Sequence, residues 1–367
     1  MTDTEYMARA LDLAQRGWGW TRPNPLVGAV LVKDGRIIGE GFHQKCGGPH
    51  AEREALACCT ESPEGATLYV TLEPCCHQGR TPPCTEGILA AGIRRVVVGS
   101  SDPNPLVAGK GLAQLRQGGV EVLQGVLEEA CDALNRVFFH FIRTGTPYVT
   151  LKYAMTMDGK IAAHTGLSRW ITGPEARHRV HQDRHRCAAM MVGVGTVLAD
   201  DPMLNCRLPE CRQPVRIVCD THLRTPVTAQ VVTTAGQVET ILATCREDQQ
   251  AYRPYLEAGC QVLTLPQREG RVDLSALMAE LGRRNLDSVL LEGGATLNWA
   301  ALSAGVVQRV QAYVAPKLLG GAGAPSPVGG QGVDSPDAAF HLSPPTVTRL
   351  GEDLLLESEV LACLPAL

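Results

Sequence analysis

The stretch that most constrains the fold of this chain lies between His50 and Cys84. His50 is followed two residues later by Glu52, and then, after one strand's worth of chain, by Pro74-Cys75 and by Cys84. Zinc in proteins is held by nitrogen and sulfur ligands, and its catalytic sites leave one of four positions to water. One histidine, two cysteines and one unbound carboxylate are therefore the groups that activated-water chemistry requires. The fold has to bring them to one point.

The pattern His-x-Glu followed by Pro-Cys and a further cysteine is typical of zinc-dependent deaminases, in which the glutamate carries protons and does not bind the metal. The usual Cys-x-x-Cys spacing is missing, so Cys75, Cys76, Cys84 and His77 compete for two ligand positions. Pro74 directly before Cys75 matches the signature and makes Cys75 the first choice, with Cys84 closing the site.

Hydrophobic patterns in the first half predict an α/β domain with three layers, helix on sheet on helix. Thr2 and Glu5 predict a capping box for a first helix, and Pro49 predicts the start of the helix that carries His50. Residues two apart on a helix point away from each other, so His50 and Glu52 can address one metal only if this helix approaches it by its N-terminus. The expected strands are 28–32, 36–39, 66–72, 95–99 and 120–123, with a long helix at 128–143.

A second domain is expected after a break near residue 145, where glycine and proline follow the long helix. We place the domains at 1–145 and 146–367. Strands are predicted at 147–152, 188–193, 215–220 and 288–292, with a helix from Pro174. Gly293-Gly294 after a strand is a weak signal for phosphate binding at a helix start, and it is not a Gly-x-Gly-x-x-Gly fingerprint.

Several longer motifs resemble one family, the bifunctional deaminase and reductase enzymes of riboflavin biosynthesis. They are His77-x-Gly79-Arg80-Thr81-Pro82-Pro83-Cys84, the run 102–111, the run 195–207 and Glu292-Gly293-Gly294. The resemblance implies a cytidine-deaminase-like domain followed by a dihydrofolate-reductase-like domain. The first would use Zn²⁺ to deaminate a diaminopyrimidinone that bears ribose 5-phosphate, and the second would use NADPH to reduce the ribosyl group to ribityl.

The same resemblance implies roles for individual residues. In the first half it implies zinc on His50, Cys75 and Cys84, proton transfer by Glu52, and substrate contacts from Asn24, His43, His77, Arg80 and Asn104. In the second half it implies NADP contacts from Ala154, Trp170, Thr196, Asp200, Gly294, Ala295, Thr296 and Leu297, and substrate contacts from Ser168, Arg184, Leu204, Arg207 and Glu292. Asp200 is expected to be the catalytic residue there. Thr221 and Arg224, after the strand that ends at Asp220, are candidates for the extra phosphate of NADPH.

Less specific explanations exist for several of these residues. Asn24, His43 and Asn104 could each satisfy their own turns. Arg184 has histidines at positions 181 and 185, so a solvated helix face is nearly as good an explanation as a phosphate contact. Cys58 and Cys59 are best explained as small buried thiols.

Composition narrows the function classes further. A net charge of −4 and an aromatic fraction of 4% argue against a nucleic-acid binder, including a deaminase of nucleic-acid bases. Glu52 argues against a purely structural zinc site. No apolar run reaches membrane-spanning length, and the polar amino terminus is unlike a signal peptide. We therefore expect a cytoplasmic protein whose 14 cysteines are mostly buried thiols, and a homo-oligomer, either dimer or tetramer.

Overall fold

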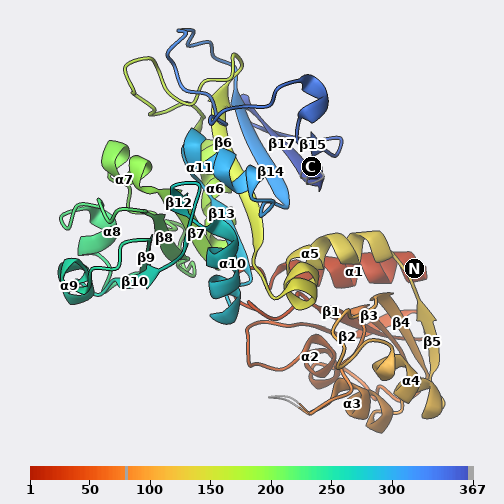
Figure 1. The fold of residues 1–367 in the computed structure, drawn as a ribbon. Helices are drawn as coiled ribbons and strands as arrows, with labels where there is room; N and C mark the ends of the chain where they lie inside the picture. The colour runs from red at the N-terminus through yellow and green to blue at the C-terminus, as the bar shows by residue number, and fades with distance from the viewer. Residues whose placement is uncertain (79–81, 363–367) are drawn as a thin grey trace. The chain divides into compact units, whose positions relative to one another are not determined.

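A computed structural model describes residues 1–78 and 82–362 of the chain. The chain divides into two compact units, Met1–Gly145 and Thr146–Leu367 (Figure 1). In the described residues, no helix is long and apolar enough to cross a membrane.

The first unit is built on a mixed sheet with strand order β2-β1-β3-β4-β5. Strand β1 is antiparallel to both of its neighbours, whereas β3, β4 and β5 run parallel to one another. The parallel strands end together at one edge, where ligands of α/β sheets usually bind. The strands are β1 (Gly28–Lys33), β2 (Arg36–Phe42), β3 (Thr67–Leu72), β4 (Arg95–Ser100) and β5 (Glu121–Gln124).

Helices cover both faces of this sheet (Figure 1). Val30 packs in the cluster with residues of α1 (Asp3–Gln15), while Ala29 and Leu31 face the cluster that includes α2 (Ala51–Ala57). This alternation is what a strand buried on both sides requires. The predicted three-layer α/β/α architecture is confirmed, as is the capping box of Thr2 and Glu5. The remaining helices are α3 (Cys84–Ala90), α4 (Lys110–Gln117) and α5 (Glu128–Thr144).

The second unit has a larger sheet with strand order β10-β9-β8-β7-β13-β6-β14-β17-β15, and β16 pairs with β17. The strands from β10 to β14 in this order run parallel, and β17 is antiparallel. The strands are β6 (Tyr148–Thr156), β7 (Ala189–Gly193), β8 (Val215–Cys219), β9 (Thr240–Thr244), β10 (Gln261–Thr264), β13 (Ser288–Leu291), β14 (Arg309–Ala315), β15 (His341–Leu342), β16 (Thr346–Leu350) and β17 (Asp353–Ala362). A separate hairpin joins β11 (Gln267–Arg268) to β12 (Arg271–Val272).

Two hydrophobic cores lie on the two faces of this sheet. Met190 and Met191 are neighbours on β7, yet each belongs to a different core, as the alternation of a strand demands. The helices are α6 (Pro174–Arg186), α7 (Val194–Asp200), α8 (Gln230–Thr233), α9 (Gln249–Glu257), α10 (Leu274–Arg283) and α11 (Ala295–Ser303), with a short 3₁₀ turn at Pro336–Ala338.

The start of α2 differs from the prediction. The helix begins at Ala51 and not at Pro49, because His50 is still extended, with φ −78° and ψ 163°. The first helical hydrogen bond runs from the Glu54 amide to the His50 carbonyl. His50 is therefore the N-cap residue, and the helix approaches the cysteines by its N-terminal end, as the positions of His50 and Glu52 required.

Candidate functional site

The structure brings His50, Cys75 and Cys84 together from three separate elements. His50 precedes α2, Cys75 follows β3, and Cys84 is the first residue of α3. The Nδ1 atom of His50 lies 3.5 Å from the Cys75 sulfur and 3.4 Å from the Cys84 sulfur. In the described residues this is the one group of three or more metal-binding side chains whose ligand atoms all lie within 4.8 Å of one another.

These distances fit a zinc ion. With Zn–S bonds of about 2.3 Å and a Zn–N bond of about 2.0 Å, tetrahedral ligands stand roughly 3.5 Å apart. The observed separations of 3.4 and 3.5 Å match this without any movement of the backbone. Two thiols and one imidazole are also the donor set that zinc prefers.

The two thiols are electrostatically unequal. A hydrogen bond with Cys84, together with the neighbouring His50, lowers the pKa of Cys75 to about 4 against the opposing effect of burial. The same hydrogen bond and burial raise the pKa of Cys84. Since zinc binds thiolates, a site in which one sulfur is already ionised near neutral pH is prepared for the metal.

Glu52 lies against this cluster and is almost completely buried, with 3% of its surface exposed. Burial raises the pKa of its carboxyl group, and the neighbouring Cys75 raises it as well. Its carboxyl group is within hydrogen-bonding reach of the Cys84 sulfur. A carboxyl group whose pKa is raised toward neutral pH is suited to taking up a proton and returning it.

Asn24 and His43 lie beside the cluster in a fixed arrangement. The His43 Nδ1 atom is 2.9 Å from the carbonyl oxygen of Pro49, so this nitrogen carries the proton and donates it. The Nε2 atom then accepts a hydrogen bond from the Asn24 amide at 3.1 Å. Burial lowers the pKa of His43, which favours this neutral form. Two of the predicted substrate contacts thus lie next to His50, whose ring is 5.4 Å from that of His43.

The other candidate residues of the first unit do not all lie at the metal cluster. The sulfur of Cys76 lies 3.9 Å from the Leu106 carbonyl and is not part of the metal group. Asn104 uses its side-chain oxygen within its own turn, where it accepts the Leu106 amide at 3.1 Å. His77 is half-buried next to these segments, and Arg80 lies outside the described residues.

Glu73 is a residue that sequence reasoning missed. It is buried, and its carboxylate accepts backbone amides from Gly109 at 3.0 Å and Gly111 at 3.1 Å, with longer contacts to the amides of Asp102 and Leu112. It therefore ties the loop that contains Asn104 to the segment that carries Cys75. The available signal was an acidic residue at the end of an apolar strand, directly before Pro74-Cys75.

A test of the ligand assignment compares two neighbouring cysteines. Cys75→Ser is expected to reduce bound zinc from about one ion per chain to nearly none, because it removes one of three protein ligands. Cys76→Ser is the matched control and should retain the metal, since in the described residues its sulfur faces the Leu106 carbonyl and does not belong to the metal group. Metal content of the purified proteins measures both. Loss of zinc in Cys76→Ser alone would overturn the assignment.

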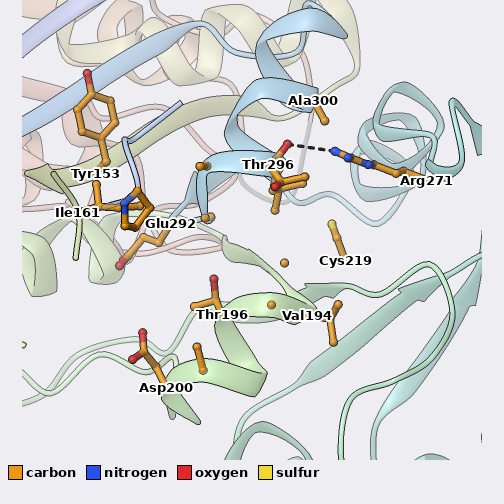
Figure 2. A pocket seen from close by; sticks show the side chains of 18 of the residues that line it. Tyr153, Ile161, Val194, Thr196, Asp200, Cys219, Arg271, Glu292, Thr296 and Ala300 are labelled. Atoms are coloured by element: carbon orange, nitrogen blue, oxygen red, sulfur yellow. Dashed lines mark hydrogen bonds between the residues drawn. The ribbon is translucent and has the colours of Figure 1, made fainter. Parts of the chain in front are cut away.

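The second unit contains a cavity of about 770 Å³. It opens at the carboxyl ends of β7, β8 and β13, the usual place for ligands of parallel sheets. Many of the predicted residues line it, namely Ala154, Ser168, Thr196, Asp200, Thr221, Glu292, Gly294, Ala295, Thr296 and Leu297. Figure 2 shows Asp200 and Glu292 on one side of the cavity and Cys219 and Arg271 on the other.

The residues at the start of α11 suit a nucleotide phosphate. Gly293 and Gly294 line the cavity and lead into α11, so backbone amides and the positive end of a nine-residue helix face the open space. The volume lies within the range of small-molecule and cofactor pockets. These residues therefore fit a dinucleotide such as NADPH.

Glu292 forms a buried charged cluster at one side of the cavity. Arg184 binds both of its carboxylate oxygens, at 2.9 and 3.0 Å, and the Lys152 ammonium lies 3.6 Å away. Burial alone would raise the pKa of Glu292, but Arg184 and Lys152 outweigh it and lower the pKa to about 2. The carboxylate is therefore ionised throughout the physiological range.

Some predicted substrate and cofactor contacts do not line the cavity. Arg184 donates a third hydrogen bond to the Asn205 carbonyl at 2.9 Å, and Leu204 is buried. Trp170 is exposed beneath the guanidinium of Arg177, and Arg207 is exposed. Sequence reasoning also missed two cationic residues that do line it, Lys152 and Arg271. Lys152 lies in β6, a strand that the sequence predicts. Arg271 lies in the hairpin of β11 and β12, which no sequence pattern indicates.

The geometry of the first unit defines a class of protein. A His/Cys/Cys cluster beside a buried glutamate, at the edge of a sheet covered on both faces, is the site of a zinc-dependent deaminase. The sequence agrees, because residues 1–100 match the profile of the cytidine and deoxycytidylate deaminase zinc-binding region. Residues 147–356 match the profile of the RibD C-terminal domain.

The chain belongs to the RibD family of riboflavin biosynthesis proteins. It is 56% identical to riboflavin biosynthesis protein RibD of Actinobacillus pleuropneumoniae over 99% of this chain and 96% of that protein. It is 45% identical to RibD of Escherichia coli strain K12 over 87% of this chain and 89% of that protein. The resemblance stated from the motifs is thereby confirmed.

Two solved structures are similar to nearly all of the chain. The diaminohydroxyphosphoribosylaminopyrimidine deaminase/5-amino-6-(5-phosphoribosylamino)uracil reductase of Thermotoga maritima superposes with a TM-score of 0.87 at 38% identity, covering 98% of each chain. Form 1 of Acinetobacter baumannii RibD gives the same TM-score and identity, covering 98% of this chain and 99% of that one. The predicted pair of folds is therefore confirmed.

Proposed function

We propose that Met1–Gly145 deaminates a phosphoribosylated diaminopyrimidinone by hydrolysis and that Thr146–Leu367 then reduces the ribosyl group of the product with NADPH. The observation that carries the first half is the group of His50, Cys75 and Cys84 beside the buried carboxyl group of Glu52. The second half is supported by the cavity that joins a phosphate-binding helix start to the charged cluster of Glu292.

In the deaminase, His50, Cys75 and Cys84 would hold a zinc ion, which would supply Lewis-acid activation of water. Glu52 accepts one proton from the attacking water at its carboxylate and passes it to the ring nitrogen; it then takes a second proton from the hydroxyl group added to the ring and passes it to the departing amine, so that ammonia leaves and the ring carbonyl forms. Asn24 and His43 bind the pyrimidine, with the His43 tautomer fixed by the Pro49 carbonyl. The nearly complete burial of Glu52 keeps bulk water from exchanging this proton.

In the reductase, NADPH supplies the hydride, and the protein supplies binding and orientation. Asp200 is the proposed residue nearest the reaction, and it accepts a hydrogen bond from Ser168 at 3.3 Å. Arg207 is the proposed contact for the substrate phosphate, because its side chain is exposed and cationic. Glu292, kept anionic by Arg184 and Lys152, offers fixed acceptors for ribose hydroxyl groups.

The proposed function is tested by following the two steps separately. The zinc-loaded protein is incubated with the phosphoribosyl diaminopyrimidinone and NADPH, and ammonia release and NADPH oxidation are recorded in parallel. Ammonia release should proceed without NADPH, whereas NADPH oxidation should require deaminated substrate. Oxidation of NADPH with the untreated diamino substrate, without ammonia release, would contradict this order of reactions.

A preference for NADPH over NADH is expected to depend on Arg271. This residue lines the cavity beyond α11, on the side away from Glu292, and its guanidinium donates to the Thr296 carbonyl at 3.4 Å (Figure 2). Arg224 and Thr221 also line the cavity. Arginine is well suited to a phosphate, and a charge-assisted hydrogen bond contributes about 1.5–3 kcal/mol.

Arg271→Gln should therefore raise the dissociation constant of NADPH by roughly 10-fold or more and leave that of NADH nearly unchanged. Titration of nucleotide fluorescence in the absence of substrate measures both constants. Arg268→Gln is the matched control, because Arg268 is exposed on the same hairpin and does not line the cavity. An equal loss of affinity for both nucleotides would argue against recognition of the extra phosphate by Arg271.

We further propose a cytoplasmic homo-oligomer, dimer or tetramer. Thiolate zinc ligands and a large number of cysteines suit a reducing compartment. Light scattering coupled to size-exclusion chromatography measures the mass in solution, and a monomeric mass at micromolar concentration would contradict the proposed assembly.

A further inference from the structure

The segment that carries Arg207 is an irregular loop, residues 205–213, which we call the arginine loop. The side chain of Arg207 is exposed, and among the described residues its guanidinium forms neither a hydrogen bond nor an ion pair. Nothing at the tip of the side chain therefore fixes its direction. The backbone of the loop, in contrast, is held at several points.

Two histidines of α6 hold the arginine loop by its amides. The Nδ1 atom of His181 accepts the backbone N–H of Arg207 at 3.2 Å, and the Nδ1 atom of His185 accepts that of Arg212 at 3.0 Å. The two histidines are four residues apart, so they project from the same face of the helix. They hold the loop near both of its ends.

The loop is also closed upon itself. The side-chain amide of Gln213 accepts the Cys206 N–H at 2.9 Å and donates to the Cys206 carbonyl at 3.0 Å, in the manner of a strand partner. The Cys206 thiol lies 3.3 Å from the carbonyl oxygen of His181. A loop closed in this way moves as one body, so its attachment to α6 determines where the backbone of Arg207 lies and which region its side chain can reach.

An imidazole nitrogen can accept an N–H only when the ring is neutral and the proton is on the other nitrogen. Burial, together with the nearby Arg184 and Arg207, lowers the pKa of His181 to about 4. The ring is therefore a neutral acceptor at physiological pH. In the described residues, His181 and His185 belong to no group arranged to hold a metal, although a His pair at this spacing often does.

We infer that His181 and His185 are positioning residues that direct Arg207 to the substrate phosphate by holding its loop against α6. The inference rests on the proposed function, in which Arg207 contacts that phosphate. Fixing the amide of Arg207 itself restricts its backbone, so less conformational freedom is lost when the side chain engages a ligand.

The test measures the reductase step with deaminated substrate. His181→Leu is expected to raise KM for the phosphorylated substrate roughly 10-fold with kcat within about twofold, because binding and not the chemical step is affected. His181→Asn should restore the original KM, since its amide oxygen can replace Nδ1 as the acceptor. His185→Leu tests the second contact in the same way and covers the case in which His181→Leu does not fold.

Three comparisons make the result specific. His178→Leu, at an exposed position on the same helix, should leave KM unchanged. With the dephosphorylated substrate, none of the histidine variants should change KM. The double variant His181→Leu/Arg207→Met should be no worse than Arg207→Met alone, because both changes remove one interaction.

The outcomes separate the inference from the function on which it rests. If Arg207→Met leaves KM for the phosphorylated substrate unchanged, Arg207 does not bind the phosphate, and that part of the proposed function is wrong. If Arg207→Met raises KM but neither histidine variant does, or if the two changes add, the positioning role is overturned. A second zinc ion per chain that is lost in both histidine variants would likewise replace the inference with a metal site.

Discussion

Replacement of Glu52 by glutamine is expected to lower the rate of ammonia release by about 10²–10⁴-fold, the contribution of a positioned general acid and base. Reduction of substrate that has already been deaminated should continue at the original rate. The two activities belong to different compact units, and Glu52 lies in the first. The measurement is ammonia release and NADPH oxidation on the same enzyme preparation.

The variant should fold, for a physical reason visible in the structure. Glu52 is 3% exposed, and burial raises the pKa of its carboxyl group, so its charged form is disfavoured where it lies. Glutamine has nearly the same shape and carries no charge, so it does not add a desolvation cost. Loss of ammonia release should therefore come without loss of thermal stability or of zinc.

Glu54→Gln supplies the matched control. Glu54 is on the same helix two residues further on and is only partly buried, so its replacement should change ammonia release by less than about twofold. If Glu52→Gln retained substantial ammonia release with zinc bound, another group would have to move the proton, and the assignment of Glu52 would be wrong.

Much of the first unit could be predicted because its signals are local. The alternation of Ala29, Val30 and Leu31 gives a strand buried on both sides, and the short spacing of His50 and Glu52 already requires approach by a helix end. The start of α2 was misplaced by two residues because proline at N1 is a preference, whereas the extended conformation of His50 depends on the site that it serves.

Interactions between distant segments could not be predicted in the same way. Glu73 accepts amides from a loop more than 30 residues away, and Arg184 binds Glu292 across 108 positions of the chain. A single sequence shows which side chains are charged but not which of them meet. For the same reason His181 and His185 looked like a solvated face, although the structure places both against the arginine loop.

The second large effect that we expect is a loss of stability when Arg184 is replaced, in contrast to Arg207. Arg184 and Arg207 were both predicted to contact substrate, but Arg184 gives its described hydrogen bonds to Glu292 and to the Asn205 carbonyl. Both members of the ion pair are shielded, with side-chain exposures of 13% and 12%. Breaking a buried pair leaves a charge without compensation, which typically costs 3–5 kcal/mol.

Arg184→Met is therefore expected to destabilise the protein by about 3 kcal/mol, at the lower end of that range because Lys152 still faces Glu292. Arg207→Met should change stability by less than about 0.5 kcal/mol, since its side chain is exposed. Urea unfolding measures both values from the transition midpoint and slope.

The exposed ion pair of Arg253 and Glu257 provides a control for charge removal itself. Its side chains are 79% and 63% exposed, so Arg253→Met should cost at most about 1 kcal/mol. Adding Glu292→Gln to Arg184→Met should recover part of the lost stability, because the second change removes the stranded carboxylate. If Arg184→Met instead left stability unchanged and raised only KM, Arg184 would act on the ligand, and the buried ion pair would not be its main role.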